Sequence, residues 1–126
     1  MSEDQSLGLI VGIGSAHGSD SFGWENSKIL LDILNGEITW RHENLAHPSQ
    51  LISLLKTKPI VLIIVDAIRS KTLEQAEYIF NLNQIKQEKQ LSEVSSHVIG
   101  ILDTLNLAEQ LKLLPSQVWF YGRNYY

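Results

Sequence analysis

Hydrophobic residues along this chain form runs of two kinds, and the two kinds alternate. Leu7–Ile13 and Pro59–Ala67 are almost continuously apolar, which is typical of strands buried on both faces of a parallel sheet. Glu37–Glu43 and Glu77–Leu82 alternate apolar with polar residues, as half-buried strands do, and Gln117–Tyr121 forms a last short strand. Pro59–Ala67 is the strongest of these strands and is therefore expected at the centre of the sheet.

Three other segments carry apolar residues at helical spacing. They are Phe22–Leu34, Ser49–Lys56, which Pro48 can open, and the long segment His97–Leu113. The polar stretch Ile85–Ser95 predicts a loop or an exposed helical turn. The resulting order, β-α-β-α-β-β-α-β, predicts an α/β fold: a three-layer α/β/α sandwich around a mainly parallel, twisted sheet of about five strands.

The composition is that of one globular domain of 126 residues, with 44% hydrophobic and 19% charged residues. The net charge is −4 and the ten Lys and Arg are scattered, so we expect neither nucleic acid nor an anionic membrane as a partner. The absence of cysteine excludes disulfides, thiolate zinc sites and a cysteine nucleophile. The acidic start, Met1–Ser6, lacks the basic region of a signal peptide and predicts a cytoplasmic protein.

Three reactive residues fall where a ligand site belongs in such a sheet, beyond the carboxyl ends of the strands. Asp20 follows the first strand, Asp66 ends the central strand, and His97 begins the last long helix. Taken singly, Asp20 can cap a helix, Asp66 can join a salt bridge, and His97 can be structural. Together, two carboxylates and one imidazole suit zinc, nickel or cobalt and leave coordination positions open.

Other chemistries of the first loop are weaker candidates. Gly12, Gly14 and Gly18 are close to a dinucleotide-binding fingerprint, but the spacing to the third glycine is one residue too long. Ser15 and Ser19 lack the G-x-S-x-G context of a serine nucleophile. The loop therefore disfavours a serine hydrolase and leaves nucleotide binding as a minor alternative.

Three histidines near this edge keep several roles open. His17, in the first loop, can bind substrate, line a pocket or face water. His42 and His47 flank the end of the second predicted strand, where we expect surface or packing histidines that can also line the rim of the site.

Three blocks of sequence follow one another in a recognisable order. They are residues 9–14 (LIVGIG) with 20–23 (DSFG), then 61–68 (VLIIVDAI), then 95–100 (SSHVIG) with 114–122 (LPSQVWFYG). In this order they resemble the motifs of the hydrogenase maturation proteases. These endopeptidases trim the carboxyl end of the nickel-iron hydrogenase large subunit.

The resemblance implies an aspartyl endopeptidase-like activity and assigns roles to particular residues. Asp20, Asp66 and His97 match the family positions that contact metal, and they would be both the catalytic and the metal-binding residues. Ser15, His17 and His47 are expected to bind substrate. The nickel would be carried by the hydrogenase large-subunit precursor, so no resident cofactor is expected, and cadmium or zinc could substitute for nickel.

The chain departs from the family pattern in two places. In the first loop, the spacer between Gly14 and Gly23 is one residue shorter than usual, Ser15 stands where the family has Asn, and the family's acidic pair is reduced to Ser19 and Asp20. Family members usually continue past the position of Tyr126, so we expect a single domain over residues 1–126 without the family's C-terminal helix and with an exposed flank that favours a homodimer. A catalytically degenerate relative, acting as a binding or assembly module, is the alternative.

Overall fold

A computed structural model describes residues 7–14, 21–33, 39–68, 76–87 and 96–125, with the side chains of 31–33 and 96–99 left aside. Its centre is a five-stranded sheet in the order β2-β1-β3-β5-β4. The strands are β1 (Leu7–Ile13), β2 (Thr39–Leu45), β3 (Val61–Ile68), β4 (Glu77–Asn81) and β5 (Gln117–Asn124). All neighbours are parallel except β4, which runs antiparallel to β5. The predicted mainly parallel α/β sheet is confirmed.

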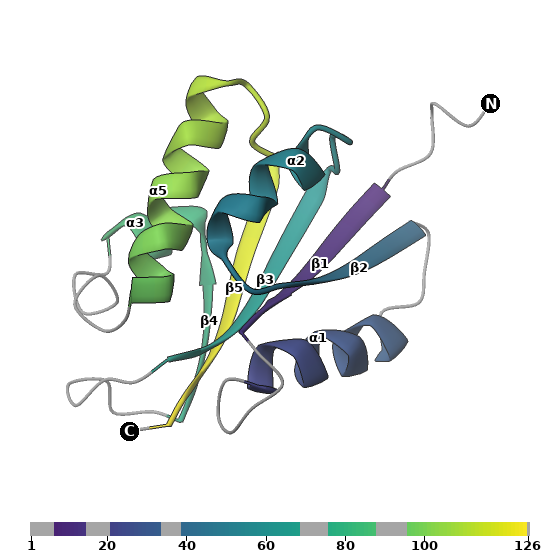
Figure 1. The fold of residues 1–126 in the computed structure, drawn as a ribbon, viewed down its shortest axis with the longest axis vertical. Coiled ribbons are helices and arrows are strands. Elements are labelled where there is room, and N and C mark those ends of the chain that lie inside the picture. Colours follow the sequence, from purple (N-terminus) through teal and green to yellow (C-terminus); the bar gives the residue numbers. More distant parts are fainter. Residues whose placement is uncertain (1–6, 15–20, 34–38, 69–75, 88–95, 126) are drawn as a thin grey trace.

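Helices cover both faces of this sheet (Figure 1). Helix α1 (Ser21–Ile33) packs on one face against β1, β2 and β3. The 3-10 turn η3 (Pro48–Gln50) leads directly into α2 (Leu51–Leu55), and α2 lies on the opposite face together with α3 (Leu82–Gln87) and α5 (Ser96–Gln110). In the described residues, no helix is long and apolar enough to cross a membrane.

The alternation of side chains along the strands divides the core between the two faces. The larger cluster, on the α5 face, contains Leu62, Ile64 and Phe120, each at most 1% exposed. The smaller cluster, on the α1 face, contains Ile10, Phe22 and Val65. The apolar runs of β1 and β3 are needed because both faces of these strands are buried, as their sequence predicts.

The polar segment Ile85–Ser95 was predicted to be a loop or an exposed helical turn, and its first residues differ from this prediction. Its first residues belong to α3, and Ile85 is 1% exposed rather than lying in a surface turn. The helix begins here because Asn81 and Gln84 form a capping box: Gln84 N–H donates to Asn81 Oδ1 at 2.9 Å, and Asn81 N–H donates to Gln84 Oε1 at 2.8 Å. Residues 88–95 lie outside the described residues.

Several predicted bounds shift by a few residues. β2 continues to Leu45, two residues beyond the predicted end, and β3 continues past Asp66 to Ile68. β3 is extended because its pairing with β5 runs as far as Ile68 opposite Asn124. Asp66 therefore lies within the strand instead of at its tip.

Candidate functional site

The carboxyl ends of β1 and β3 lie at the edge of the sheet where α1 and α5 begin (Figure 1). Ligand sites of open α/β sheets form in this place, because the loops and helix N-termini of neighbouring units converge there. The first loop of the chain leaves this edge after Gly14 and the chain returns to it at Ser21. The residues on both sides of that loop are held in place by contacts that could not be predicted from the sequence.

The flank before the loop is fixed at the end of β2. The Leu45 carbonyl accepts a hydrogen bond from Gly14 N–H at 3.0 Å and a second one from the Trp24 indole Nε1 at 3.1 Å. Gly14 has φ of 147°, a backbone conformation that side chains with a Cβ rarely adopt. One carbonyl thus anchors the start of the loop and the first turns of α1 to the same strand.

The flank after the loop is fixed by close backbone packing. A Cβ on Gly23 would overlap with the Ile13 carbonyl and lie 2.6 Å from the Val65 carbonyl oxygen. A Cβ on Gly12 would overlap with the Gly23 backbone and lie 2.5 Å from Ser27 Oγ. These glycines let the start of α1 lie directly on β1 and β3.

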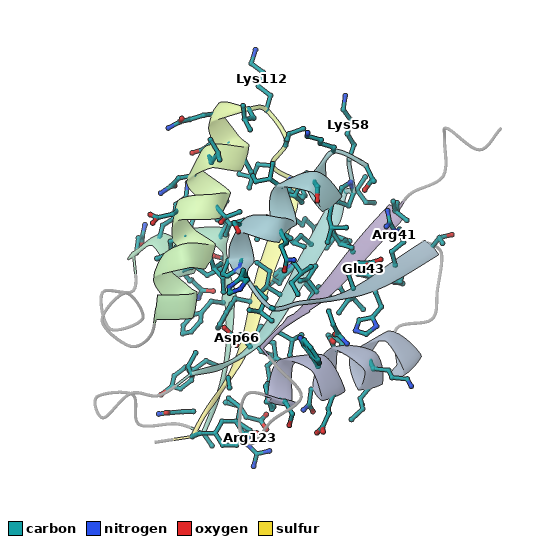
Figure 2. All side chains as sticks on the ribbon, viewed as in Figure 1. Arg41, Glu43, Lys58, Asp66, Lys112 and Arg123 are labelled. Atoms are coloured by element: carbon teal, nitrogen blue, oxygen red, sulfur yellow. The ribbon has the colours of Figure 1, made fainter. Side chains whose placement is uncertain are left out.

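Asp66 is the buried acidic residue of this edge among the residues that the structure describes. It is 1% exposed and lies on β3, with its side chain on the same face as Leu62 and Ile64, toward α5 (Figure 2). A carboxylate so deeply buried is costly as an anion, and a nearby cation or hydrogen-bond donor lowers that cost. Asp66 therefore needs a partner of this kind where it lies.

The floor beside Asp66 is formed by β5. Asp66 is in register with Gly122, and a Cβ on Gly122 would lie 2.7 Å from Phe120 Cε1 and 3.5 Å from Ile68 Cδ1. The Phe120 ring thus occupies the space that a side chain at position 122 would fill. The surroundings of Asp66 on this side are apolar, which strengthens any electrostatic interaction of its carboxylate.

His97 is the second residue of α5, and its backbone lies in the first turn of that helix. One turn later, Gly100 packs on η3: a Cβ there would lie 3.1 Å from Pro48 Cγ. Because η3 follows the end of β2, this contact holds the start of α5 at the carboxyl edge of the sheet, on the face where Asp66 lies. The side chain of His97 is outside the described residues.

Of the remaining predicted site residues, the structure describes His47 alone. Asp20, Ser15 and His17 lie outside the described residues. His47 is exposed and directly precedes η3, and its N–H donates to Gln50 Oε1 at 3.1 Å. It therefore lies on the rim beside the start of α5. Among the residues with described side chains, no three His, Asp or Glu gather in a way that would hold a metal ion.

His42 does not line this rim. Its Nε2 lies 2.6 Å from Ser27 Oγ, and Ser27 is fully buried, donates to the Trp24 carbonyl at 3.1 Å, and approaches Asn44 Oδ1 at 3.4 Å. The serine has one proton, so its hydroxyl donates to only one of these acceptors at a time, while its oxygen can accept from the His42 ring. Of the two roles left open by the sequence, the packing role is the one that His42 takes.

Three aromatic side chains form a cluster at this edge that could not be predicted from the sequence. The Phe22 ring contacts Tyr121 and Tyr125 edge to face, with ring centroids 5.6 and 5.8 Å apart. Burial raises the pKa of Tyr121 above its ordinary value, and a hydrogen bond with Glu77 and the negative charge of Glu77 raise it further. Residues 22, 121 and 125 meet only because β5 lies beside β3 under the start of α1.

Solved structures share this fold over nearly the whole chain. The hydrogenase-maturating endopeptidase HybD from E. coli matches with a TM-score of 0.66 and 20% identity, over 95% of this chain and 74% of its own. The NiFe hydrogenase maturation protease HybD from Thermococcus kodakarensis matches with a TM-score of 0.64 and 22% identity, over 94% of this chain and 79% of its own. The NiFe hydrogenase maturation protease HycI from the same organism matches with a TM-score of 0.65 and 19% identity, over 96% of this chain and 75% of its own.

No protein-family model and no curated protein sequence matches the chain. The structural likeness nevertheless extends over most of both partners in each comparison. The chain therefore has the fold of hydrogenase maturation proteases, and the resemblance noted in its sequence motifs is confirmed at the level of the fold.

Proposed function

We propose that this protein is an endopeptidase that removes the C-terminal extension of a nickel-loaded NiFe hydrogenase large-subunit precursor. The observation that carries the proposal is Asp66, a buried acid at the carboxyl edge of a sheet whose fold is that of hydrogenase maturation proteases. A buried carboxylate is an unusual feature for packing alone, because its desolvation is costly.

In this proposal, Asp20, Asp66 and His97 contact the nickel that the substrate carries. Support for the arrangement comes from the anchored flanks of the first loop, which end at Gly14 and Ser21, and from the first turn of α5 at the same edge. Two carboxylates and an imidazole offer the oxygen and nitrogen donors that a borderline divalent ion accepts. Because the ion arrives with the precursor, the protease works without a metal of its own.

The reaction is the addition of water to the scissile carbonyl, followed by breakage of the C–N bond. The substrate's nickel, held by these residues, polarises the carbonyl or lowers the pKa of a bound water. The carboxylate less engaged with the ion takes the proton of the water, which then passes to the leaving amine of the tail. Ser15, His17 and the exposed His47 line the path of the peptide around this centre in the same proposal.

The test is cleavage of nickel-loaded precursor, scored by the mass of the released tail. Wild-type protein should release the tail, whereas Asp66→Asn should slow release by at least about 100-fold, the size of effect seen when a principal electrostatic group is lost. Asp103→Asn is the matched control, because Asp103 is exposed on α5, and it should cleave like the wild type.

Two outcomes would count against the proposal. Full activity of Asp66→Asn would remove Asp66 from the reaction. No cleavage by wild-type protein, in an assay where a related maturation protease does cleave the same precursor, would instead favour a non-catalytic binding or assembly module on this fold.

A further inference from the structure

The two edges of the sheet are protected to different degrees. β2 carries Arg41 and Glu43, whose side chains are 3.5 Å apart and both partly exposed (Figure 2). β4, at the other edge, carries Tyr78, Ile79 and Phe80 in succession and has neither Lys, Arg nor Pro. Charged side chains and proline are the usual devices that stop an edge strand from pairing with another chain. β4 carries a single charged side chain, Glu77 at its first residue, and its other four residues are uncharged and include no proline.

The backbone of β4 directs its alternate peptide groups away from the sheet. Asn124 N–H donates to the Ala76 carbonyl at 2.7 Å, so Ala76 faces β5. In an antiparallel ladder both groups of a residue point to the same side and successive residues alternate. The N–H and C=O of Ile79 therefore point outward, where no strand lies among the described residues.

The side chain of Ile79 adds an apolar surface to this edge. Ile79 is 68% exposed, and it borders a groove of about 530 Å³ between α1 and the β4–β5 face of the sheet. Ile29 of α1, 53% exposed, and Trp119 of β5, 37% exposed, form other parts of its wall. Exposed apolar side chains gathered beside an open strand edge are typical of an interaction surface.

We propose that a second copy of this chain pairs with β4 edge to edge, antiparallel, about a two-fold axis at Ile79. This register brings outward-facing residues opposite each other and pairs all five residues of the strand. Ile79 then lies opposite Ile79 of the second copy, and Tyr78 lies opposite Phe80 of the second copy. The result is a continuous sheet across both copies, an isologous interface of the kind most common among homodimers.

Charge and hydrogen bonding agree with this register. Glu77 lies opposite Asn81 of the second copy, a neutral amide, so no like charges meet across the axis. The two Ile79 residues exchange a pair of backbone hydrogen bonds, and each Glu77 N–H donates to the Asn81 carbonyl opposite. The N–H of Asn81 keeps its own acceptor, Gln84 Oε1, at 2.8 Å.

The aromatic pair on the other face is also complementary to itself. Tyr78 stacks on Phe80 with ring centroids 5.5 Å apart and an interplanar angle of 11°. In the dimer, the two stacks lie side by side across the axis, a cross-strand arrangement that stabilises antiparallel sheets. This dimer is independent of the proposed peptidase activity, because it uses none of the proposed catalytic residues.

Sedimentation velocity of the purified protein tests the dimer directly. The wild type should sediment, with increasing concentration, as a species of twice the 14.2 kDa of one chain. Ile79→Pro removes only an outward N–H, so it spares the pairing with β5 but should leave the protein monomeric. Ile79→Val, which keeps the strand and the apolar contact, should remain dimeric. Circular dichroism checks that the variants are folded.

A cross-link identifies the contact itself. The chain contains no cysteine, so Ile79→Cys introduces a single thiol, and residues directly opposite in a ladder lie within disulfide reach. Under oxidation this variant should run as a covalent dimer, whereas Ile29→Cys, in the same groove but on α1, should not. A monomeric wild type at all concentrations, a dimer that survives Ile79→Pro, or equal cross-linking of both variants would overturn the proposal.

Discussion

Asp66 and Tyr121 are polar side chains at the same edge of the sheet, on opposite faces of it. Asp66 is buried toward α5, and in the proposed reaction its carboxylate contacts the ion that the substrate carries. Tyr121 lies under the start of α1, between the Phe22 ring and the Glu77 carboxylate. The first residue bears on function and the second on how stability changes with pH.

Stability should fall at alkaline pH because of Tyr121. Burial, together with hydrogen bonding and the charge of Glu77, raises the pKa of this phenol above its ordinary value of 10.0. A raised pKa favours the neutral form in the folded state, so its contribution to stability is complete below pH 10 and is lost as the pH rises through the folded pKa. Tyr121→Phe should therefore show a smaller loss of unfolding free energy over this range.

Urea unfolding at a series of alkaline pH values measures this effect. Glu77→Gln is the informative companion, because it removes the negative charge while leaving a polar group, and it should lower the pKa of Tyr121. Identical slopes of unfolding free energy against pH in the wild type and Tyr121→Phe would show that Tyr121 does not carry the effect.

At the scale of elements, α1 is held to β1 and β3 through glycines, and α5 is held to η3 through a looser contact. A Cβ on Gly23 would overlap with backbone atoms of both strands, which cannot move without breaking the ladder. A Cβ on Gly100 would meet the ring of Pro48, where a small adjustment is enough. The two glycines, each in a helix, should respond differently to the same substitution.

Gly23→Ala should lower the free energy of unfolding by at least the ~1–3 kcal/mol typical of overpacking. Gly100→Ala should change it by less than about 1 kcal/mol, because the gain in helix propensity offsets the contact 3.1 Å from Pro48. Denaturant unfolding of both variants gives the comparison. A loss at Gly100→Ala equal to that at Gly23→Ala would contradict the difference in packing.

How well each strand or helix could be predicted depends on whether local or distant residues determine it. The continuous apolar runs at Leu7–Ile13 and Val61–Ile68 could be recognised as buried strands because both of their faces are covered. The end of β3 was predicted one residue short, at Ala67, since its last residue is fixed by pairing with β5, more than 50 residues away in sequence. The start of α3 depends on the capping box of Asn81 and Gln84, a local signal that lay beside a mostly polar segment.

At the scale of the whole molecule, the order of strands and helices brings Asp66 and the first turn of α5 to one edge of the sheet. The sequence was sufficient to place Asp66 and the start of α5 there, because parallel strands end at the same side of a sheet. It could not predict the Phe22–Tyr121–Tyr125 contacts or the bond between His42 and Ser27, since these pairs depend on how α1 lies on the sheet. Long-range packing of this kind leaves no periodic pattern.

The dependence of cleavage on nickel tests the central proposal most directly. Purified wild-type protein is incubated with the same NiFe hydrogenase large-subunit precursor in nickel-loaded and nickel-free form, and the tail is detected by mass. If Asp20, Asp66 and His97 read the ion that the substrate carries, only the loaded precursor should be cut. Equal cleavage of both forms would contradict this account.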